Sequence, residues 1–387
     1  MSCFFGGKVL NFQRPGLKTG EKIMVAMSGG VDSSVAALLL QEAGYRPIGV
    51  TLRLWVDPHA EEKVAGTDRG CSSLEAVDRA RKAAATLNIP HYVFDMQEIF
   101  HERVVSYFIR EYLRGRTPNP CIACNRHLKF THLLQKMQAA GFNYLATGHY
   151  ARILYEPQGH SYRLFRAEDK EKDQSYMLYT LCQEQLSALL FPLGGYHKKE
   201  VKELAQKRGL EMAQIRESQE ICFIPDHDYR GFLARENPRA AVPGEIISTT
   251  GQKLGTHRGT AFYTIGQRKG LGLSARNPLY VVKIDYRNNI LIVGEKEETY
   301  SEYLTAADLN FIDDVSPHHP LEIEAKIRYR ASPMPAVLYP SGEGRVEVVF
   351  KEKQKAVTPG QAVVFYRGEE VLGGGTILSS EIDEQFV

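Results

Sequence analysis

The stretch from Lys22 to Ser34 constrains the fold of this 387-residue chain more than any other. Its apolar run Ile23 to Met27 predicts a short buried strand, of the kind found in parallel sheets covered on both faces. Two adjacent glycines, Gly29 and Gly30, interrupt the run, and the almost wholly apolar segment Val35 to Leu40 predicts a packed helix. A buried strand is therefore expected to turn sharply into a helix here.

The turn itself, Ser28-Gly-Gly-Val-Asp-Ser33, has the composition of a phosphate cradle. Paired glycines let the backbone approach an anion closely, and the helix N-terminus that follows adds a favourable dipole. It is not the GxxxxGK[ST] loop, because the lysine that would reach the outer phosphates is missing. The turn is therefore suited to holding pyrophosphate as it leaves, with Asp32 as a candidate Mg2+ ligand.

This turn resembles the SGGxDS signature of the PP-loop ATP pyrophosphatase family. The resemblance implies that ATP is cleaved between its α and β phosphates and that a carbonyl-type oxygen is adenylated. It leaves the substrate open, so other residues must identify it.

Length and composition predict a globular protein of two or three domains, since the chain is 43% hydrophobic and 24% charged. There is no run of 18 apolar residues, and the first residues, MSCFFGGKVLNF, lack the apolar core of a signal peptide, so we expect a cytoplasmic protein with no membrane partner. The six scattered cysteines do not suit a secreted disulfide framework, which leaves thiol chemistry or metal binding. The net charge of +2 decides little, because a polyanion partner needs only one basic face.

Strands alternate with helices through the first half of the chain. Strands are predicted at Pro47 to Trp55, His91 to Asp95 and Asn143 to His149, and helices at Leu74 to Leu87 and Phe100 to Leu113. This alternation predicts an α/β fold with a doubly wound parallel sheet, whose ligands bind beyond the carboxyl ends of the strands. The Ser28 to Ser33 turn, Leu52 and Gly148 fall at such ends and can converge on one nucleotide.

Strand patterns dominate the second half of the chain. Strands are predicted at Ala261 to Ile265, Tyr280 to Ile284 and Ile290 to Val293, with a hairpin turn at Arg287 to Asn289, and alternation returns in Leu321 to Tyr329 and parts of Arg345 to Phe350. We therefore predict an N-terminal extension (1–20), a PP-loop ATP-binding domain (21–215), a small mixed central domain (216–298) and a C-terminal antiparallel β-barrel (299–387).

A second informative stretch runs from Arg114 to Phe130 and contains Cys121 and Cys124. Two prolines fix a rigid loop before a predicted helix, whose N-terminus and neighbouring arginines would lower a thiol pKa and favour the thiolate. Between residues 105 and 135 there are five Arg and Lys side chains and one acid, which is a footprint for a polyanion. A single CxxC is also half of a structural zinc site, but no second CxxC or CxxH partner occurs elsewhere in the sequence.

The third stretch, Arg216 to Pro225, contains Cys222 among apolar neighbours, where an isolated cysteine is usually a small buried hydrophobe. Its companions change that interpretation. Five segments in this order, SGGVDS, TPNPCIAC, ATGHYAR, KDQSYML and ESQEICFIP, resemble those of the bacterial and mitochondrial tRNA-specific 2-thiouridylase family (MnmA/TrmU type). The resemblance extends from about Lys22 to the C-terminus, where Lys326 to Arg330 and Val357 to Gln361 also match.

This resemblance implies ATP-dependent transfer of sulfur to C2 of the wobble uridine in the tRNAs for Lys, Glu and Gln. ATP adenylates the uracil O2, pyrophosphate leaves, a sulfur nucleophile attacks C2, and AMP departs. The positions that match ATP-binding residues of the family are Ala26, Met27, Ser28, Gly29, Gly30, Val31, Asp32, Ser33, Leu52 and Gly148. The positions that match its contacts with the target base or with the rest of the tRNA are Asn119, Pro120, Cys121, His149, Lys172, Asp173, Gln174, Arg328, Tyr329 and Gln361. Cys124 matches the first catalytic cysteine and Cys222 the one that carries the persulfide.

Many members of the family carry Asp where this chain has Cys121, and two mechanisms stay open. In the first, a persulfide on Cys222 attacks C2 and Cys124 releases the product by forming a disulfide, with Cys121 a spare or alternative resolving thiol. In the second, Cys121, Cys124 and Cys222 ligate a 4Fe-4S cluster that keeps one iron open for hydrosulfide. The family implies a cysteine desulfurase or a persulfide relay protein as sulfur donor. Cys71 and Cys182 are interpreted as structural and Cys3 as having no role.

Two other classes of protein remain as alternatives. One is another PP-loop ligase, such as an amidotransferase-type synthetase or argininosuccinate synthase, which would not need the three cysteines or the basic loop. The other is a nonenzymatic tRNA-binding or redox-sensing protein, which would have no need for an intact Ser28 to Ser33 turn.

Overall fold

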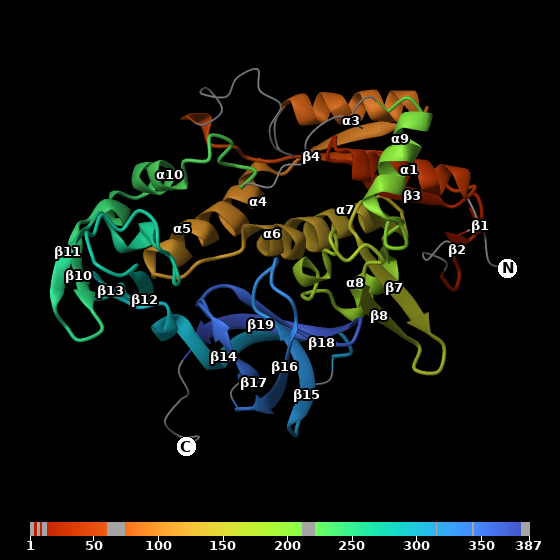
Figure 1. Cartoon of the computed structure of the whole chain (residues 1–387). Coiled ribbons are helices and arrows are strands. Elements are labelled where there is room, and N and C mark those ends of the chain that lie inside the picture. Colours follow the sequence, from red (N-terminus) through yellow and green to blue (C-terminus); the bar gives the residue numbers. More distant parts are fainter. Residues whose placement is uncertain are drawn as a thin grey trace.

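The computed structural model describes residues 4–5, 8–9, 14–59, 74–210, 221–314, 316–342 and 344–380. It contains an α/β domain, a small domain beside it and a β-barrel below both (Figure 1). Cys3, Cys71 and the predicted division at residue 215 lie outside the described residues, and the domain boundaries stay predictions. Within the predicted N-terminal extension, β1 Phe4–Phe5 pairs with β2 Lys8–Val9.

The α/β domain is built on a five-stranded parallel sheet of order β5-β4-β3-β6-β9. Its strands are β3 Lys22–Ala26, β4 Arg46–Arg53, β5 His91–Asp95, β6 Leu145–Thr147 and β9 Leu189–Leu190. Strands are added outward from β3 on one side, and the chain then returns to add β6 and β9 on the other. The switch point of this doubly wound sheet therefore lies between β3 and β6, and the predicted fold is confirmed.

Helices cover both faces of the sheet. They are α1 Val31–Glu42, α3 Leu74–Thr86, α4 Gln97–Phe100, α5 Ser106–Leu113, α6 Pro120–Ala123, α7 Leu133–Ala139, α8 Gln183–Ala188 and α9 Lys198–Lys207, with a 3-10 turn, η3 Ser175–Met177. Two π-helical segments, η1 His101–Val105 and η2 Cys124–His132, make the runs 97–113 and 120–139 continuous. Along β3, Ile23 and Val25 pack with α1, α3 and α9, whereas Met24 packs with η2 and α7, so this strand is apolar because both of its faces are buried.

The central domain combines α10 Tyr229–Glu236 with a four-stranded mixed sheet of order β11-β10-β13-β12. Its strands are β10 Gly244–Ser248, β11 Lys253–His257, β12 Tyr280–Asp285 and β13 Ile290–Gly294, and its 3-10 turns are η5 Pro238–Ala241 and η6 Thr260–Phe262. The predicted hairpin between β12 and β13 is confirmed. The strand predicted at Ala261 to Ile265 is wrong, because η6 and a loop occupy this segment. Its apolar residues are buried in the domain core, and a short apolar run does not distinguish a strand from other buried structure.

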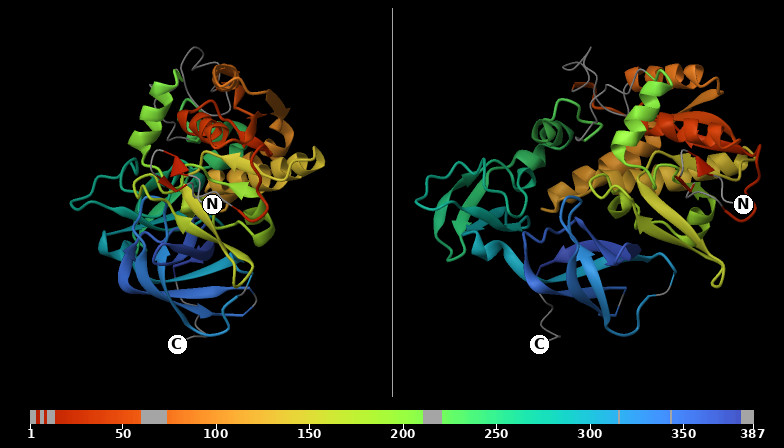
Figure 2. Two further views of the ribbon diagram at one scale, coloured as in Figure 1. Left: turned by 90° about the vertical axis from the view of Figure 1, so that its right-hand side faces the viewer. Right: turned by 45° about the vertical axis from the view of Figure 1, so that its right-hand side comes forward.

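Six antiparallel strands close the predicted C-terminal barrel in the order β14-β17-β16-β15-β18-β19, because β14 also pairs with β19. They are β14 Tyr300–Phe311, β15 Leu321–Lys326, β16 Met334–Pro340, β17 Val346–Lys355, β18 Ala362–Arg367 and β19 Glu370–Ser379, preceded by η7 Glu297–Thr299. A hairpin of the α/β domain, β7 Ala151–Glu156 and β8 Ser161–Arg166, adds to the edge of this sheet through β8 and β19. The barrel (blue) is therefore joined to the α/β domain by strand pairing (Figure 2).

Candidate active site

The Ser28 to Ser33 turn lies at the switch point, between the end of β3 and the first turn of α1. Gly29 has a φ of +74°, and a Cβ there would lie 2.3 Å from the carbonyl oxygen of Ala76 at the start of α3, so only glycine fits. The Ser33 hydroxyl accepts a hydrogen bond from Ser28 N at 3.1 Å and donates to the Gly30 carbonyl at 3.1 Å. The turn is thus held in one conformation by its own side chains. Gly30 caps α1 without a side-chain hydrogen bond, as in helix N-termini that bind anions.

The other positions matched to ATP lie at the same edge of the sheet. Leu52 lies near the carboxyl end of β4, and Gly148 follows β6. A Cβ at Gly148 would lie 2.7 Å from Ser33 N and 2.8 Å from the carbonyl carbon of Asp32, so the end of β6 touches the first turn of α1. The structure therefore brings these residues together around the turn, and their role in binding ATP stays a prediction.

The carboxylate of Asp32 is held by two side chains that sequence reasoning did not select. The Lys198 ammonium, from the first residue of α9, lies 2.7 Å from both Oδ1 and Oδ2 of Asp32. The Tyr150 hydroxyl donates to Oδ1 at 2.7 Å. As a result, the predicted Mg2+ ligand is already engaged in this structure. Tyr150 belongs to the ATGHYAR segment, but Lys198 is 166 residues from Asp32 and gave no local signal.

The segment with the two clustered cysteines starts a helix at the position predicted. The Asn119 side chain caps α6 by accepting hydrogen bonds from Cys121 N at 3.1 Å and Ile122 N at 3.3 Å, and Pro120 occupies the first turn. The α-helix becomes π-helical at Cys124, a geometry often found at functional sites.

The cysteines differ in exposure. Cys121 is exposed, Cys124 is buried and Cys222 is half-buried, and none of them forms a disulfide in this structure. Cys124 and Cys222 pack in the same apolar core with Phe108 and Phe223. Across the described residues, no group of three or more His, Cys, Asp or Glu side chains is arranged to hold a metal ion, and this includes the cysteines proposed for the 4Fe-4S cluster.

The loop that leads into α6 is held by contacts from the two other domains. Thr117 N donates to the Pro359 carbonyl at 2.9 Å, and the Gln361 side chain donates to the Thr117 carbonyl at 2.7 Å, both from the barrel. The Thr117 hydroxyl donates to Thr264 of the central domain at 3.1 Å. Gly360 has a φ of +89° and no space for a Cβ, which would lie 2.9 Å from Thr117 N. The barrel thus fixes the loop that carries Asn119.

Some positions matched to tRNA contacts have structural partners. The buried Asp173 accepts hydrogen bonds from the backbone of Ala167 and from Ser175, and it pairs with Arg166 at 3.2 Å. The Gln174 side chain accepts from Tyr150 N at 3.0 Å, which positions the tyrosine that contacts Asp32. Other predicted contacts lie nearer the surface, since Lys172 and Tyr329 are half-buried and Arg328 is exposed. Their contacts with tRNA stay predictions.

His149 is a neutral side chain in this environment. Burial and, to a smaller degree, the charge of Lys129 hold its pKa well below the usual value of 6.5. Its Nδ1 lies 2.7 Å from the Thr147 hydroxyl, and its ring packs between Phe130 and Phe191. It therefore does not supply a positive charge for phosphate at neutral pH.

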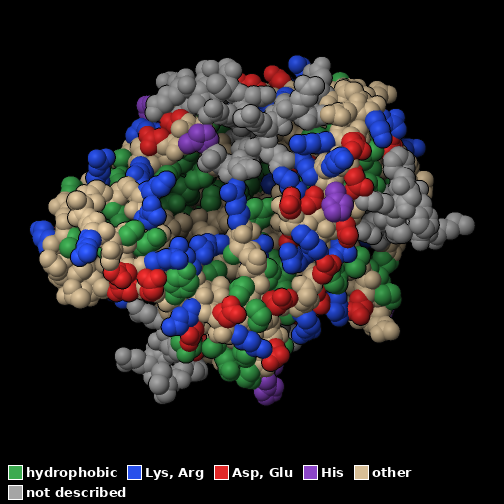
Figure 3. All heavy atoms as spheres, in the orientation of Figure 1, with side chains coloured by type: hydrophobic (Ala, Val, Ile, Leu, Met, Phe, Trp, Pro, Cys, Tyr) green, Lys and Arg blue, Asp and Glu red, His purple; other side chains and the backbone are tan. Residues whose placement is uncertain are grey.

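A basic hollow opens between the α/β and central domains. Arg110 and Arg114 line a cavity of about 390 Å³ together with His101, Ser106, Ile109, Leu113, Glu236 and Asn237. On the face drawn in Figure 3, Lys and Arg side chains also gather around a hollow. This region has the charge and shape that a polyanion such as RNA requires.

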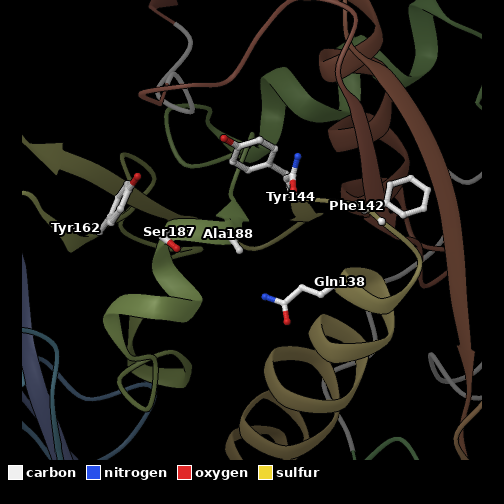
Figure 4. Close-up of a pocket in the computed structure, with 8 residues that line it drawn as sticks. Gln138, Phe142, Tyr144, Tyr162, Ser187 and Ala188 are labelled. Atoms are coloured by element: carbon white, nitrogen blue, oxygen red, sulfur yellow. The ribbon is translucent and has the colours of Figure 1, made fainter.

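A second cavity, of about 500 Å³, lies at the opposite end of β6, because Tyr144 in its wall directly precedes that strand. Gln138, Tyr162 and Ser187 also line it (Figure 4). The buried Arg14 packs over the Tyr162 ring, 4.8 Å from its centroid, and donates to the carbonyls of Leu186 and Leu189. This cavity is therefore separate from the Ser28 to Ser33 turn.

Three family models match consecutive parts of the chain. A model described as the tRNA methyl transferase HUP domain matches residues 21–226, one described as the tRNA methyl transferase PRC-barrel domain matches residues 230–295, and one described as an aminomethyltransferase beta-barrel domain matches residues 301–377. The fold and these matches define a HUP-domain protein with two appended β domains.

Curated relatives resemble almost the whole chain. A protein of Carboxydothermus hydrogenoformans is 52% identical over 360 residues, 92% of this chain and 97% of the relative. Proteins of Caldanaerobacter subterraneus (51%, over 93% of this chain and 99% of the relative) and Acetivibrio thermocellus (49%, over 92% and 99%) are similar to the same extent. All three carry the name tRNA-specific 2-thiouridylase. The chain belongs to the tRNA-specific 2-thiouridylase family.

A solved complex of a 4-thiouridine synthetase with RNA and bound ATP is 17% identical, with a TM-score of 0.33 over 57% of this chain and 52% of the other. A likeness this small carries no functional information. No described helix combines the length and the apolar character that a membrane span requires.

Proposed function

We propose that the chain is an ATP-dependent tRNA sulfurtransferase that replaces the 2-oxygen of the wobble uridine by sulfur in the tRNAs for Lys, Glu and Gln. The observation that carries the proposal is that one fold contains both a turn suited to phosphate and a helix start that carries cysteines. A turn suited to anions lies at the switch point of the sheet, and a capped cysteine loop is fixed by the barrel and the central domain. Identity of about half over nearly the whole length of the relatives supports the same function. The methyl transfer in the family-model descriptions would require neither part.

The first step activates the base. The uracil O2 attacks the α-phosphorus of ATP, and the bond from that phosphorus to the bridging oxygen breaks, so that pyrophosphate leaves with the electron pair. The Gly29 and Gly30 backbone and the N-terminus of α1 are suited to hold the phosphates during this step. Since C2 lies inside the stacked anticodon loop, the base must be splayed out to react, and the basic hollow lined by Arg110 and Arg114 is suited to the neighbouring backbone.

The second step transfers sulfur. The terminal sulfur of a Cys222 persulfide attacks C2, and AMP leaves with the former O2, which gives a Cys222–S–S–C2 adduct. The Cys124 thiolate then attacks Cys222 Sγ, the S–S bond breaks, and its electron pair stays on the sulfur now bound to C2. The Cys124–Cys222 disulfide that remains must be reduced by a thiol reductant. The shared apolar core of these two cysteines supports this pairing. The sulfur donor is proposed to be a cysteine desulfurase or a persulfide relay protein.

The arrangement of the residues does not favour the predicted Mg2+ site or the predicted 4Fe-4S cluster. The Asp32 carboxylate is occupied by Lys198 and Tyr150, and Cys121, Cys124 and Cys222 do not form a metal-binding group in this structure. We therefore derive no step through Mg2+ or a 4Fe-4S cluster. Cys121 is exposed, at a position where the family resemblance implies Asp in many members, and is proposed as a spare or alternative resolving thiol.

The proposal is tested by thiolation of unmodified tRNA with ATP and a persulfide donor, after anaerobic purification with iron analysis. The substitution C222S should abolish thiolation and spare ATP and tRNA binding. The double substitution C121S/C124S should instead trap tRNA on the enzyme as an adduct that added thiol releases. C182S is the matched control, because Cys182 caps α8 and serine is a good N-cap.

Other outcomes identify the alternatives. Thiolation by the C222S protein would contradict the assignment of the persulfide carrier. About four irons per chain with cluster-dependent activity would replace the persulfide route by the cluster route. ATP cleavage without thiolation of any tRNA would favour another PP-loop ligase, and the absence of both would favour a nonenzymatic protein.

A further inference from the structure

The Ser28 to Ser33 turn has a charge problem that its own residues do not solve. It lacks the lysine of GxxxxGK[ST] loops, and Asp32 places a carboxylate in the first turn of α1, beside the backbone that would hold phosphate. A carboxylate at this position repels the β and γ phosphates of ATP and the pyrophosphate formed from them. A positive charge from another element is therefore needed.

The fold brings two cations to this place: Arg79 of α3, whose Nε donates to the Gly29 carbonyl at 3.4 Å, and Lys198, which contacts Asp32. Its ammonium is bidentate to Asp32, at 2.7 Å from each oxygen, and lies 5.8 Å from the centroid of the Tyr150 ring. Its side chain is only 9% exposed, whereas that of Asp32 is 29% exposed. Solvent therefore reaches the ion pair mainly at Asp32.

The fold holds Lys198 in a fixed position. Its backbone N donates to the Asp169 carboxylate at 2.9 Å, and Glu200 closes a capping box with His197 at the start of α9. The α9 residues Val201 and Ala205 pack in the same core as α1. The ammonium is therefore delivered by a rigid helix, which is the arrangement that electrostatic stabilisation of a leaving group requires.

An ion pair of this kind is a weak source of stability, because desolvation offsets much of its attraction. We propose that Lys198 is the phosphate-binding cation of the site, which exchanges its contact with Asp32 for the β and γ phosphates of ATP and then holds the departing pyrophosphate. The inference rests on the proposed use of ATP and deepens it, because it assigns to α9 the role that the loop lysine has in GxxxxGK[ST] proteins.

The test is equilibrium binding of ATP, AMP and pyrophosphate to the full chain by titration calorimetry. The substitution K198M should weaken ATP and pyrophosphate about 10- to 100-fold, the range for loss of a charged hydrogen bond, and change AMP by less than about 3-fold. K198R keeps the charge and should retain most of the pyrophosphate affinity. K199M, on the exposed neighbouring residue, is the matched control and should change none of the three.

A second variant keeps the test decisive if K198M does not fold. The substitution D32N removes the carboxylate that engages Lys198 and repels phosphate. In the presence of EDTA, the D32N protein should therefore bind pyrophosphate several-fold more tightly than the unchanged chain. Equal or weaker binding by D32N, or a K198M protein that loses AMP as strongly as ATP, would overturn the proposal. Thiolation activity of the unchanged chain is measured separately. If the unchanged chain thiolates tRNA but K198M does not change the pyrophosphate affinity, only this inference is refuted. If pyrophosphate binding depends on Lys198 but no tRNA is thiolated, only the proposed function is refuted.

Discussion

Gln361 gives the sharpest test of how the barrel contributes to catalysis. Sequence resemblance assigns it to tRNA contact, but its amide donates to the Thr117 carbonyl at 2.7 Å in the loop before α6. The substitution Q361A removes this hydrogen bond and leaves the carbonyl without that donor, at a cost of about 1–3 kcal/mol. The contacts of Thr117 with Pro359 and Thr264 remain, so we expect the loop to loosen without unfolding.

The consequence should appear in the chemical step. Asn119, two residues after Thr117, caps the helix that carries Cys121 and Cys124, and a displacement of about 1 Å there can reduce a rate about 100-fold. We expect Q361A to lower the single-turnover rate of thiolation about 10- to 100-fold at saturating tRNA. We also expect the Kd for tRNA to change by less than about 3-fold, because the lost hydrogen bond joins two parts of the protein and does not contact tRNA.

The assay compares single-turnover thiolation with filter binding of the same tRNA. Q354A is the matched control, because the Gln354 amide bonds the carbonyl of Glu352 on its own strand of the barrel. A large loss of tRNA affinity with an unchanged single-turnover rate would refute the loop-positioning role, and it would support the direct tRNA contact inferred from the sequence.

Two further predictions concern the turn and its neighbour. G29A should lower the free energy of unfolding by at least about 2 kcal/mol in urea denaturation, because the new Cβ would lie 2.3 Å from the Ala76 carbonyl oxygen at a positive φ. It should also abolish ATP binding. An ATP affinity equal to that of the unchanged chain would contradict the assignment of this turn as the phosphate site. His149, whose folded pKa is lowered by burial, takes up a proton more readily when unfolded, so its contribution to stability is present above about pH 6.5 and is lost as the pH falls below that value. Urea unfolding between pH 7.5 and 5.5 should therefore show the unchanged chain losing up to about 1.4 kcal/mol per pH unit more than H149N, and a pH-independent difference would mean that His149 titrates normally.

Local patterns predicted the elements that one segment can specify by itself. The Lys22 to Ser34 stretch predicted β3, the glycine turn and α1, because an apolar strand, two glycines and an apolar helix each have local signatures. The alternation of strands and helices predicted the doubly wound sheet, and its topology then brought Leu52 and Gly148 to the turn. The helix start predicted near Cys121 and Cys124, after a loop fixed by two prolines, is confirmed, whereas the cap that Asn119 provides was not predicted.

Features that depend on segments far apart in the chain were not predictable in this way. The pairing of β8 with β19 joins residues about 200 positions apart, and neither strand pattern names its partner. The apolar run Ala261 to Ile265 was misread as a strand because burial, and not strand pairing, explains its composition. The role of Gln361 was equally hidden, since its partner Thr117 lies 244 residues away.

The absence of a lysine from the Ser28 to Ser33 turn is informative once the position of Lys198 is known. The α9 sequence KKEVKELAQK has charges on most of one face, and nothing in it separates Lys198 from Lys199 or Lys202 as a solvated side chain. The sequence indicated only that the Ser28 to Ser33 turn has an acid and no lysine, and it suggested Asp32 as a Mg2+ ligand and not a second cation. Helix geometry resolves the choice, because Lys198 is buried on the side that faces α1 whereas Lys199 is exposed. In a phosphate-binding turn that lacks its own lysine, the tertiary fold can therefore supply the charge that the local motif omits, from a helix packed against the turn.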